Sequence, residues 1–362
     1  MKKLFAIQAI TVLVFIAVGC KVSEADIFSN SNIFVGGNNR TIIADVNGDG
    51  YNDVIADAVY LNDGNGNFTN YNARPGGQIT GYTGYDTKDL DNDGDLDFVK
   101  CGGTRCEIYF NDGTGYFTLN ETYNVSPGYV YDCRAADLNN DGFIDIVVPG
   151  HGYNYPANIL WNQKDGTFII QDISPYGTSC GVDIGDYDND GDFDILWSNN
   201  MSTTRIHNND GRGGFSTGYQ FPWNYVSGSP ISTFTDLNSD GFLDAIILPS
   251  HSNSIYINNG DGTYSNISNV PGVENLYKSA DIDNDGDDDI GFNYLNDGNG
   301  NLTLSEESWT HWWGLGDLNG DGFLDMASDY IYYNTLGASQ INTPPTIPDG
   351  LTATITESSI TF

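Results

Sequence analysis

Basic residues are scarce in this chain of 362 residues. It has 13 Lys and Arg against 49 Asp and Glu, which gives a formal net charge of −36. Binding to nucleic acid or to an anionic membrane surface depends on clustered Lys and Arg. So few basic residues cannot form such a cluster, and we expect neither nucleic acid nor a bare membrane surface as a partner.

Apolar runs long enough to span a membrane are also missing. The one extended apolar segment, Leu4–Val18, follows Met1-Lys2-Lys3 and is too short and wrongly flanked for a membrane span. It predicts a signal peptide over residues 1–20, and therefore export. Ala17-Val18-Gly19-Cys20 resembles a bacterial lipobox, in which Cys20 is lipidated, although Ala17 stands where Leu is usual. The alternatives are a lipoprotein anchored at the cell surface or outer membrane, and ordinary cleavage with secretion.

Cysteine and histidine are few. The chain has five Cys and four His, no CxxC and no His at ligand spacing, which argues against zinc. Apart from Cys20, four cysteines remain in a chain predicted to reach an oxidising compartment, and they allow three pairings. Cys101 and Cys106 flank a tight Gly-rich turn, whereas Cys133 and Cys180 occupy similar places in adjacent repeats. We therefore predict the disulfides Cys101–Cys106 and Cys133–Cys180.

Asp-Gly loops of one pattern, by contrast, are abundant. Seven segments read Asp-x-[Asp/Asn]-x-Asp-Gly-x-x-Asp and hold more than half of the acidic residues: Asp45–Asp53, Asp89–Asp97, Asp137–Asp145, Asp186–Asp194, Asp236–Asp244, Asp281–Asp289 and Asp317–Asp325. A single copy is usually an ordinary turn. Seven in-phase copies argue against that reading, because carboxylates packed so densely repel one another unless a cation lies among them.

The spacing within each loop suits calcium. Side chains at positions 1, 3, 5 and 9 can converge, Gly at position 6 permits a sharp turn, and position 7 offers its carbonyl. All of these donors are hard oxygens, which favours calcium over zinc or copper. We therefore predict up to seven calcium ions as cofactors. The predicted ligands are Asp45, Asn47, Asp49, Tyr51, Asp53, Asp89, Asp91, Asp93, Asp95, Asp97, Asp137, Asn139, Asp141, Phe143, Asp145, Asp186, Asp188, Asp190, Asp192, Asp194, Asp236, Asn238, Asp240, Phe242, Asp244, Asp281, Asp283, Asp285, Asp287, Asp289, Asp317, Asn319, Asp321, Phe323 and Asp325.

An EF-hand or a dockerin is excluded by position 12 of these loops. An EF-hand carries a bidentate acid there and helices on either side. This chain has other residues at that position: Ala56, Lys100, Val148, Trp197, Ile247, Phe292 and Ser328. No stretch shows sustained helical periodicity either, so the loops must connect strands.

The loops recur every 36 to 50 residues, the range of four-stranded propeller blades. In each repeat a β-rich stretch precedes the loop and a short apolar strand follows it. A further strand and a Gly-rich hairpin such as Asn62–Phe68 come next, and we interpret the hairpin as structural turn chemistry. The sequence therefore predicts an all-β, seven-bladed β-propeller with a calcium loop in each blade.

These residues resemble the FG-GAP, or VCBS, repeats of integrin α-subunit propellers and of exported bacterial proteins. The blocks Asp145–Gly150 and Asp244–Pro249 are similar to the strand and Gly-Ala-Pro turn that name the motif, whereas its Phe-Gly half is poorly kept. The bacterial VCBS branch therefore fits better than true integrins. The resemblance covers roughly residues 27–340 and implies a calcium-stabilised propeller, but this scaffold carries many functions.

The composition changes after Leu336. Residues 341–348 form a Pro-rich linker, and residues 349–362 resemble the opening of a fibronectin type III domain. The sequence stops far short of a whole sandwich of that kind. Either it is a fragment or this tail is a stray strand, and we favour the fragment.

The function expected from these features is binding: a calcium-binding adhesion or capture module for carbohydrate or extracellular protein, and a monomer. One alternative is a polysaccharide-processing enzyme, since some lyases use calcium-bound propellers of this repeat family; another is a passive spacer. Proton abstraction beside a uronate needs a base such as His. His151 and His251 lie in equivalent turns, however, which is typical of a repeat. No catalytic set stands apart from the loops, so we predict no catalytic residues.

Two structural expectations complete the prediction. The last repeat lacks its full Gly-rich hairpin while residues 27–34 precede the first repeat, so we expect this segment to form the outer strand of blade 7. If calcium loops and hairpins occupy one face, the opposite face carries the ligand. The predicted ligand-binding residues, on blades 3 to 5, are Tyr153, Tyr155, Trp223 and Tyr225.

Overall fold

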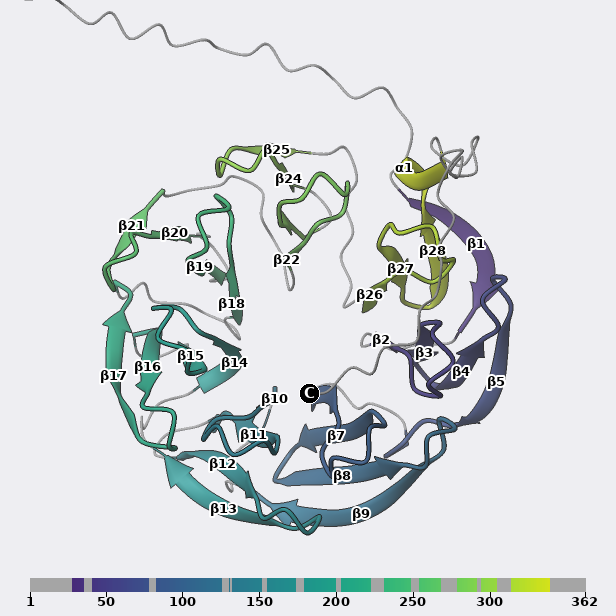
Figure 1. The fold of residues 1–362 in the computed structure, drawn as a ribbon, viewed down its shortest axis with the longest axis horizontal. Helices are drawn as coiled ribbons and strands as arrows, with labels where there is room; N and C mark the ends of the chain where they lie inside the picture. Colours follow the sequence, from purple (N-terminus) through teal and green to yellow (C-terminus); the bar gives the residue numbers. More distant parts are fainter. Residues whose placement is uncertain are drawn as a thin grey trace, which may run out of the picture.

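The computed structural model describes residues 28–35, 41–77, 83–125, 130, 132–151, 155–173, 179–199, 203–222, 231–248, 254–267, 279–291, 294–304 and 314–338. In these ranges the chain forms seven four-stranded antiparallel sheets arranged in a ring (Figure 1). The prediction of an all-β, seven-bladed propeller is therefore confirmed. The predicted signal peptide with Cys20, the Pro-rich linker and the fibronectin-like tail lie outside the described residues. Within these ranges, no helix is long and apolar enough to cross a membrane.

The strands follow the chain blade by blade, from the centre of the ring outward, except that β1 is the outer strand of blade 7. Blade 1 is β2 (Ile42–Ala44), β3 (Asp53–Ile55), β4 (Ala58–Asn62) and β5 (Phe68–Ala73); blade 2 is β6 (Thr83–Lys88), β7 (Asp97–Gly102), β8 (Arg105–Asn111) and β9 (Phe117–Asn124); blade 3 is β10 (Arg134–Ala136), β11 (Asp145–Val148), β12 (Ala157–Asn162) and β13 (Phe168–Ile173); blade 4 is β14 (Ser179–Gly185), β15 (Asp194–Asn199), β16 (Arg205–Asn209) and β17 (Phe215–Gln220). Blade 5 is β18 (Ile231–Thr235), β19 (Asp244–Leu248), β20 (Ser254–Asn258) and β21 (Tyr264–Asn266); blade 6 is β22 (Ser279–Ala280), β23 (Asp289–Ile290), β24 (Tyr294–Asn296) and β25 (Leu302–Leu304); blade 7 is β26 (Gly314–Gly316), β27 (Asp325–Ala327), β28 (Tyr330–Asn334) and β1 (Phe28–Phe34).

The middle strands of a blade are buried on both faces. Every residue of β11 and of β15 is buried, which explains why each holds three consecutive apolar residues rather than an alternating pattern. The outermost strands differ, since β9 is buried only at Phe117 and Tyr123. Each blade therefore packs both faces of its sheet against its neighbours and exposes its outer edge.

The core lies between blades. One cluster joins Val99 and Ile108 of blade 2 to Ile146 and Leu160 of blade 3, and all four side chains are at most 1% exposed. Similar clusters recur around the ring. Removal of this apolar surface from water is the main driving force for stacking the blades.

The ring closes through the N-terminal segment. Strand β1 pairs antiparallel with β28, with Phe28 opposite Asn334 and Phe34 opposite Tyr330. This confirms the expected outer strand of blade 7, although residue 27, the first of the expected segment, lies outside the described ranges. Phe28 is buried among Ile282 and Met326, and the short helix α1 (Thr335–Ala338) takes the place of the seventh hairpin.

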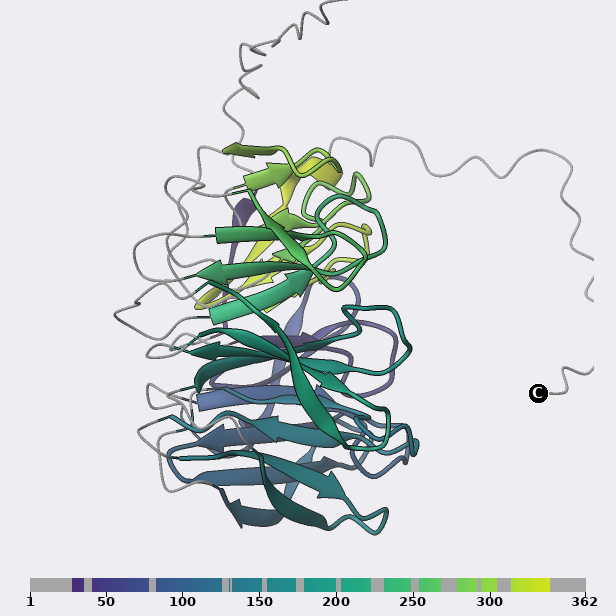
Figure 2. The same cartoon turned by 90° about the vertical axis from the view of Figure 1, so that its left-hand side faces the viewer.

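The connections alternate between the two faces of the ring. In each blade from 1 to 6, an Asp-rich loop joins the first strand to the second and a Gly-rich hairpin joins the third to the fourth. Because neighbouring strands run antiparallel, both connections emerge on one face, on the right in Figure 2. We call this the loop face. The turns between second and third strands lie on the opposite face.

The cysteines follow the predicted pairing for Cys101 and Cys106 but not for Cys133. A disulfide joins Cys101 on β7 to Cys106 on β8, which face each other in register. The predicted Cys133–Cys180 disulfide is not formed, because Cys133 is a free, buried thiol. Its side chain packs against Cys101 and Cys106, toward blade 2, whereas Cys180 lies on β14 in blade 4. Burial raises the pKa of the Cys133 thiol well above its usual value.

Candidate functional site

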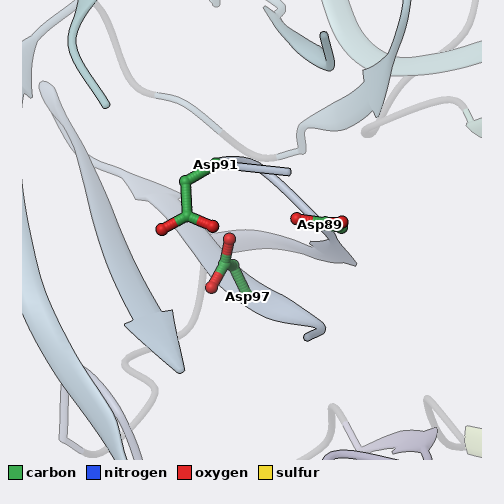
Figure 3. A group of neighbouring side chains, drawn as sticks. All are labelled: Asp89, Asp91 and Asp97. Atoms are coloured by element: carbon green, nitrogen blue, oxygen red, sulfur yellow. The ribbon is translucent and has the colours of Figure 1, made fainter. Parts of the chain in front are cut away.

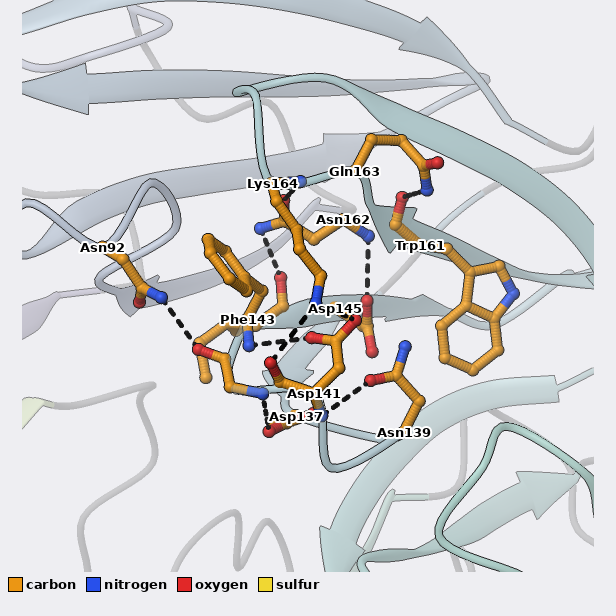
Figure 4. A network of polar contacts seen from close by, with 12 residues as sticks. Asn92, Asp137, Asn139, Asp141, Phe143, Asp145, Trp161, Asn162, Gln163 and Lys164 are labelled. Atoms are coloured by element: carbon orange, nitrogen blue, oxygen red, sulfur yellow. Dashed lines mark hydrogen bonds and ion pairs between the residues drawn. The ribbon is translucent and has the colours of Figure 1, made fainter.

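The seven Asp-rich loops share one hydrogen-bonded frame, shown for blade 3 in Figure 4. Asp137 at position 1 accepts the N–H of Asp141 at 3.1 Å through Oδ1 and that of Gly142 at 2.8 Å through Oδ2. Asp141 Oδ1 accepts the N–H of Phe143 at 3.0 Å. The contact between position 1 and the glycine at position 6 recurs in all seven loops. Each loop is therefore curled around its own carboxylates.

The buried aspartate at position 9 completes this hydrogen-bonded frame from the core side of the loop. Asp145 is 0% exposed, and its two oxygens accept the N–H groups of Leu138 at 3.2 Å and Asn162 at 2.8 Å. Equivalent bonds occur in every loop. Burial raises the pKa of Asp145 to about 7, against the lowering effect of these bonds. The sequence predicted a metal ligand here, and the structure adds that this carboxylate connects the loop to the third strand.

An asparagine at the start of each hairpin links neighbouring blades. Asn162 Nδ2 donates to the carbonyl of Leu90 in the loop of blade 2 at 2.7 Å and to that of Ile144 at 3.1 Å. The corresponding residues make the same bridge in every blade: Asn62, Asn111, Asn209, Asn258, Asn296 and Asn334. Their role was missed, since the hairpin was interpreted as turn chemistry alone. The available signal was the recurrence of Asn at the same place in seven repeats.

The loops fall into two classes. Those of blades 1, 3, 5 and 7 have Asn at position 3 and an aromatic residue at position 7, whereas those of blades 2, 4 and 6 have Asp at both. Three carboxylates bring one oxygen each to within 4.8 Å of one another in each acidic loop: Asp89, Asp91 and Asp97; Asp186, Asp188 and Asp194; Asp281, Asp283 and Asp285. Figure 3 shows the first of these groups.

The acidic loops leave carboxylate oxygens without a partner among the described residues. Oδ1 of Asp188, Oδ1 of Asp283 and Oδ1 of Asp287 are shielded from solvent and accept no hydrogen bond. Burial and then the charges of neighbouring aspartates raise the pKa of Asp188 and of Asp283. A hard divalent cation would satisfy these oxygens and remove the repulsion. The donor set therefore fits calcium at the residues that the sequence predicted.

The inner strands carry a second polar cluster, which the sequence did not reveal. Arg134 on β10 lies 2.8 Å from Asp132 and 3.6 Å from Asp183 of blade 4. Asp86 on β6 accepts the N–H of Ala135 at 2.8 Å, and Asp183 accepts that of Phe234 at 2.8 Å. These bonds join the inner strands of blades 2 to 5 and give the cluster a structural role.

The predicted ligand-binding residues are mostly beyond the described ranges. Tyr153, Trp223 and Tyr225 fall outside them. Tyr155 is described and half-buried, in the connection between β11 and β12 on the face opposite the loop face. The described residues therefore do not test whether these four side chains lie together, and their shared role stays a prediction.

Comparisons with known proteins agree with this architecture. A model of the FG-GAP-like repeat matches residues 45–100, 89–148 and 236–292. The chain is 29% identical over 176 residues to a phosphatidylinositol-glycan-specific phospholipase D of Dictyostelium discoideum, a match that covers 45% of this chain and 16% of that protein. The chain thus spans well under two thirds of the length of this relative.

Two solved structures share the fold. One is of an Agrocybe aegerita lectin that recognises non-reducing terminal N-acetylglucosamine, with 20% identity, a TM-score of 0.52, and coverage of 73% of this chain and 79% of the lectin. The other is BBS1N in complex with ARL6DN, with 10% identity, a TM-score of 0.55, and coverage of 85% and 97%. At these identities the likeness shows the fold alone. The chain contains FG-GAP-like repeats and is a seven-bladed β-propeller.

Proposed function

We propose that this protein is an exported, calcium-binding β-propeller that serves as a binding module for carbohydrate or extracellular protein. The observation that carries the calcium part is the set of solvent-shielded, unpartnered oxygens of Asp188, Asp283 and Asp287 within loops of one repeated frame. Groups of this kind are costly to bury unless a cation is present.

Calcium would act here as part of the fold. Each loop is joined to its own third strand through position 9, and through the hairpin asparagine to the loop of the preceding blade. Neutralising one loop therefore also stabilises the contact between two blades. Any ion that binds only the folded state raises stability with the logarithm of its free concentration over its Kd.

Thermal melting tests this proposal. In EDTA the melting temperature of the full chain should fall by about 10 °C or more, since several sites each lose a few kcal/mol of binding free energy. Millimolar calcium should restore it, whereas sodium at the same concentration should not. Identical melting curves with and without calcium would contradict the calcium proposal.

The binding part of the proposal has a separate basis. The structurally similar lectin recognises a terminal sugar, and in this chain the face opposite the loop face is free of the Asp-rich loops. We propose carbohydrate as the first ligand class to test, on a glycan array with the calcium-loaded protein. Binding only to proteins would change the ligand class, and depolymerisation of acidic polysaccharides would favour the enzyme alternative instead.

A further inference from the structure

One loop of the ring already carries a cation from the chain itself. In blade 3, Lys164 extends from the hairpin toward the Asp-rich loop (Figure 4). Its Nζ lies 3.3 Å from Oδ2 of Asp141, at position 5, and 3.4 Å from the Asp141 carbonyl oxygen. It also lies over the ring of Phe143, 5.0 Å from the centroid. The ammonium group thus occupies the edge of the predicted calcium site.

The oxygen that Lys164 contacts is the one that the loop frame leaves available. Asp141 Oδ1 accepts the N–H of Phe143, so Oδ2 is the oxygen that can face an ion. In the sister loops of the same class, the equivalent oxygen accepts a neutral side-chain amide, as for Asp49 from Asn47 at 2.9 Å and Asp240 from Asn238 at 3.0 Å. An amide can rotate and offer its carbonyl to a cation, whereas an ammonium group has only donors and must leave.

The backbone position of Lys164 supports a role for its side chain. Its φ is +67°, in the left-handed region that disfavours a side chain. The equivalent residue is glycine, also at positive φ, in five other blades: Gly64, Gly113, Gly211, Gly260 and Gly298. A lysine at this position is therefore opposed by local conformational preference, and the interaction with Asp141 offsets that cost.

We propose that Lys164 is a tethered counterion of the blade 3 loop, which makes this loop the weakest calcium site of the ring and keeps it stable when calcium is low. The inference rests on the proposed calcium function and goes beyond it, since it assigns different affinities to otherwise similar loops. A calcium ion would have to displace the Lys164 ammonium group from Asp141 in order to bind. The displaced ammonium group would stay nearby and still repel the ion.

Calcium titration of the full chain against a chromophoric chelator tests this. Replacing Lys164→Gln should leave the number of bound ions unchanged and tighten the weakest Kd about three- to tenfold, as expected for removing one positive charge about 5 Å from a divalent ion in salt-containing water. Lys164→Arg keeps the charge and should change little. Lys100→Gln, which removes a lysine paired with Glu107 on blade 2, is the matched control and should match the wild type.

The Asp141→Asn background makes the assignment specific, because Lys164 has lost its carboxylate partner there and Lys164→Gln should no longer lower the melting temperature in EDTA. Melting temperatures separate the proposal from a purely structural role: Lys164→Gln should melt lower than the wild type in EDTA but not in saturating calcium. A lower melting temperature in both conditions, or unchanged affinities in the variant, would overturn this inference alone. A wild-type protein that binds no calcium would overturn the proposed function as well.

Discussion

At the scale of single residues, an asparagine at the end of the third strand of each blade joins that blade to its neighbour. In blade 3 this residue is Asn162, which is 4% exposed. Its side-chain amide donates to two carbonyls from adjacent blades, and its backbone N–H donates to the carboxylate of Asp145. Alanine keeps the backbone bond and removes the bridge. It thereby leaves the carbonyls of Leu90 and Ile144 without this partner, the first in a buried and the second in a partly buried position.

We therefore predict that Asn162→Ala destabilises the protein by about 2–4 kcal/mol, the cost of one buried and one partly buried hydrogen bond with their carbonyls left unpaired. Melting in saturating calcium measures it, and the calcium affinities of blades 2 and 3 should weaken together. The control is Asn65→Ala in the exposed hairpin of blade 1, which should stay within about 0.5 kcal/mol of the wild type. Equal effects of the two substitutions would contradict the bridging role.

At the scale of elements, strand β1 decides whether the ring is closed. It comes from the opposite end of the chain to the rest of blade 7 and covers the edge of β28. An uncovered edge strand exposes unpaired N–H and C=O groups and invites pairing with another molecule. Phe28 at one end of the strand is 3% exposed, whereas Phe34 at its other end is 62% exposed.

Two substitutions of the same kind in this strand give a matched comparison. Phe28→Ala should cost about 3 kcal/mol or more, because it opens a cavity beside Ile282 and Met326. Phe34→Ala should cost less than about 1 kcal/mol. Melting temperature and light scattering measure the two effects, and only Phe28→Ala should increase self-association. Comparable losses from both would show that β1 does not close the ring through its buried end.

At the scale of the whole molecule, the two loop classes alternate around most of the ring. Blades 2, 4 and 6 carry Asp at positions 3 and 7, and blades 1, 3, 5 and 7 carry Asn and an aromatic residue. More carboxylates around one ion increase its affinity and also increase the repulsion in its absence. The ring as a whole should therefore bind three ions tightly and the others more weakly.

Exchanging the two classes tests this arrangement. The double substitution Asp188→Asn with Asp192→Phe gives loop 4 the pattern of loop 5 and should reduce the tight sites from three to two. The reciprocal change, Asn238→Asp with Phe242→Asp, should raise them to four. Isothermal titration with calcium counts the sites, and an unchanged count in both variants would refute a division by carboxylate number.

The amino-acid sequence alone was enough to predict the blade count, the strand order, the position of each loop and the closing strand. These follow from local patterns, because an Asp-Gly loop between two short apolar runs specifies its own turn whatever surrounds it. Most candidate site residues were predicted in the same way, since positions 1, 3 and 5 of a loop are neighbours along the chain. The composition likewise pointed to the acidic character of the loops before any contact was known.

The contacts between distant residues could not be predicted from the sequence and follow from the packing of the blades. Asn162 and Leu90 are 72 residues apart in the sequence. Their side chain and carbonyl meet only because blade 3 packs against blade 2. Cys133 faces blade 2 rather than blade 4 for the same reason, so the second disulfide was predicted wrongly. The contact of Lys164 with Asp141 crosses 23 residues within one blade. Such pairs depend on how sheets stack and strands register, which is a property of the packed ring and not of any segment.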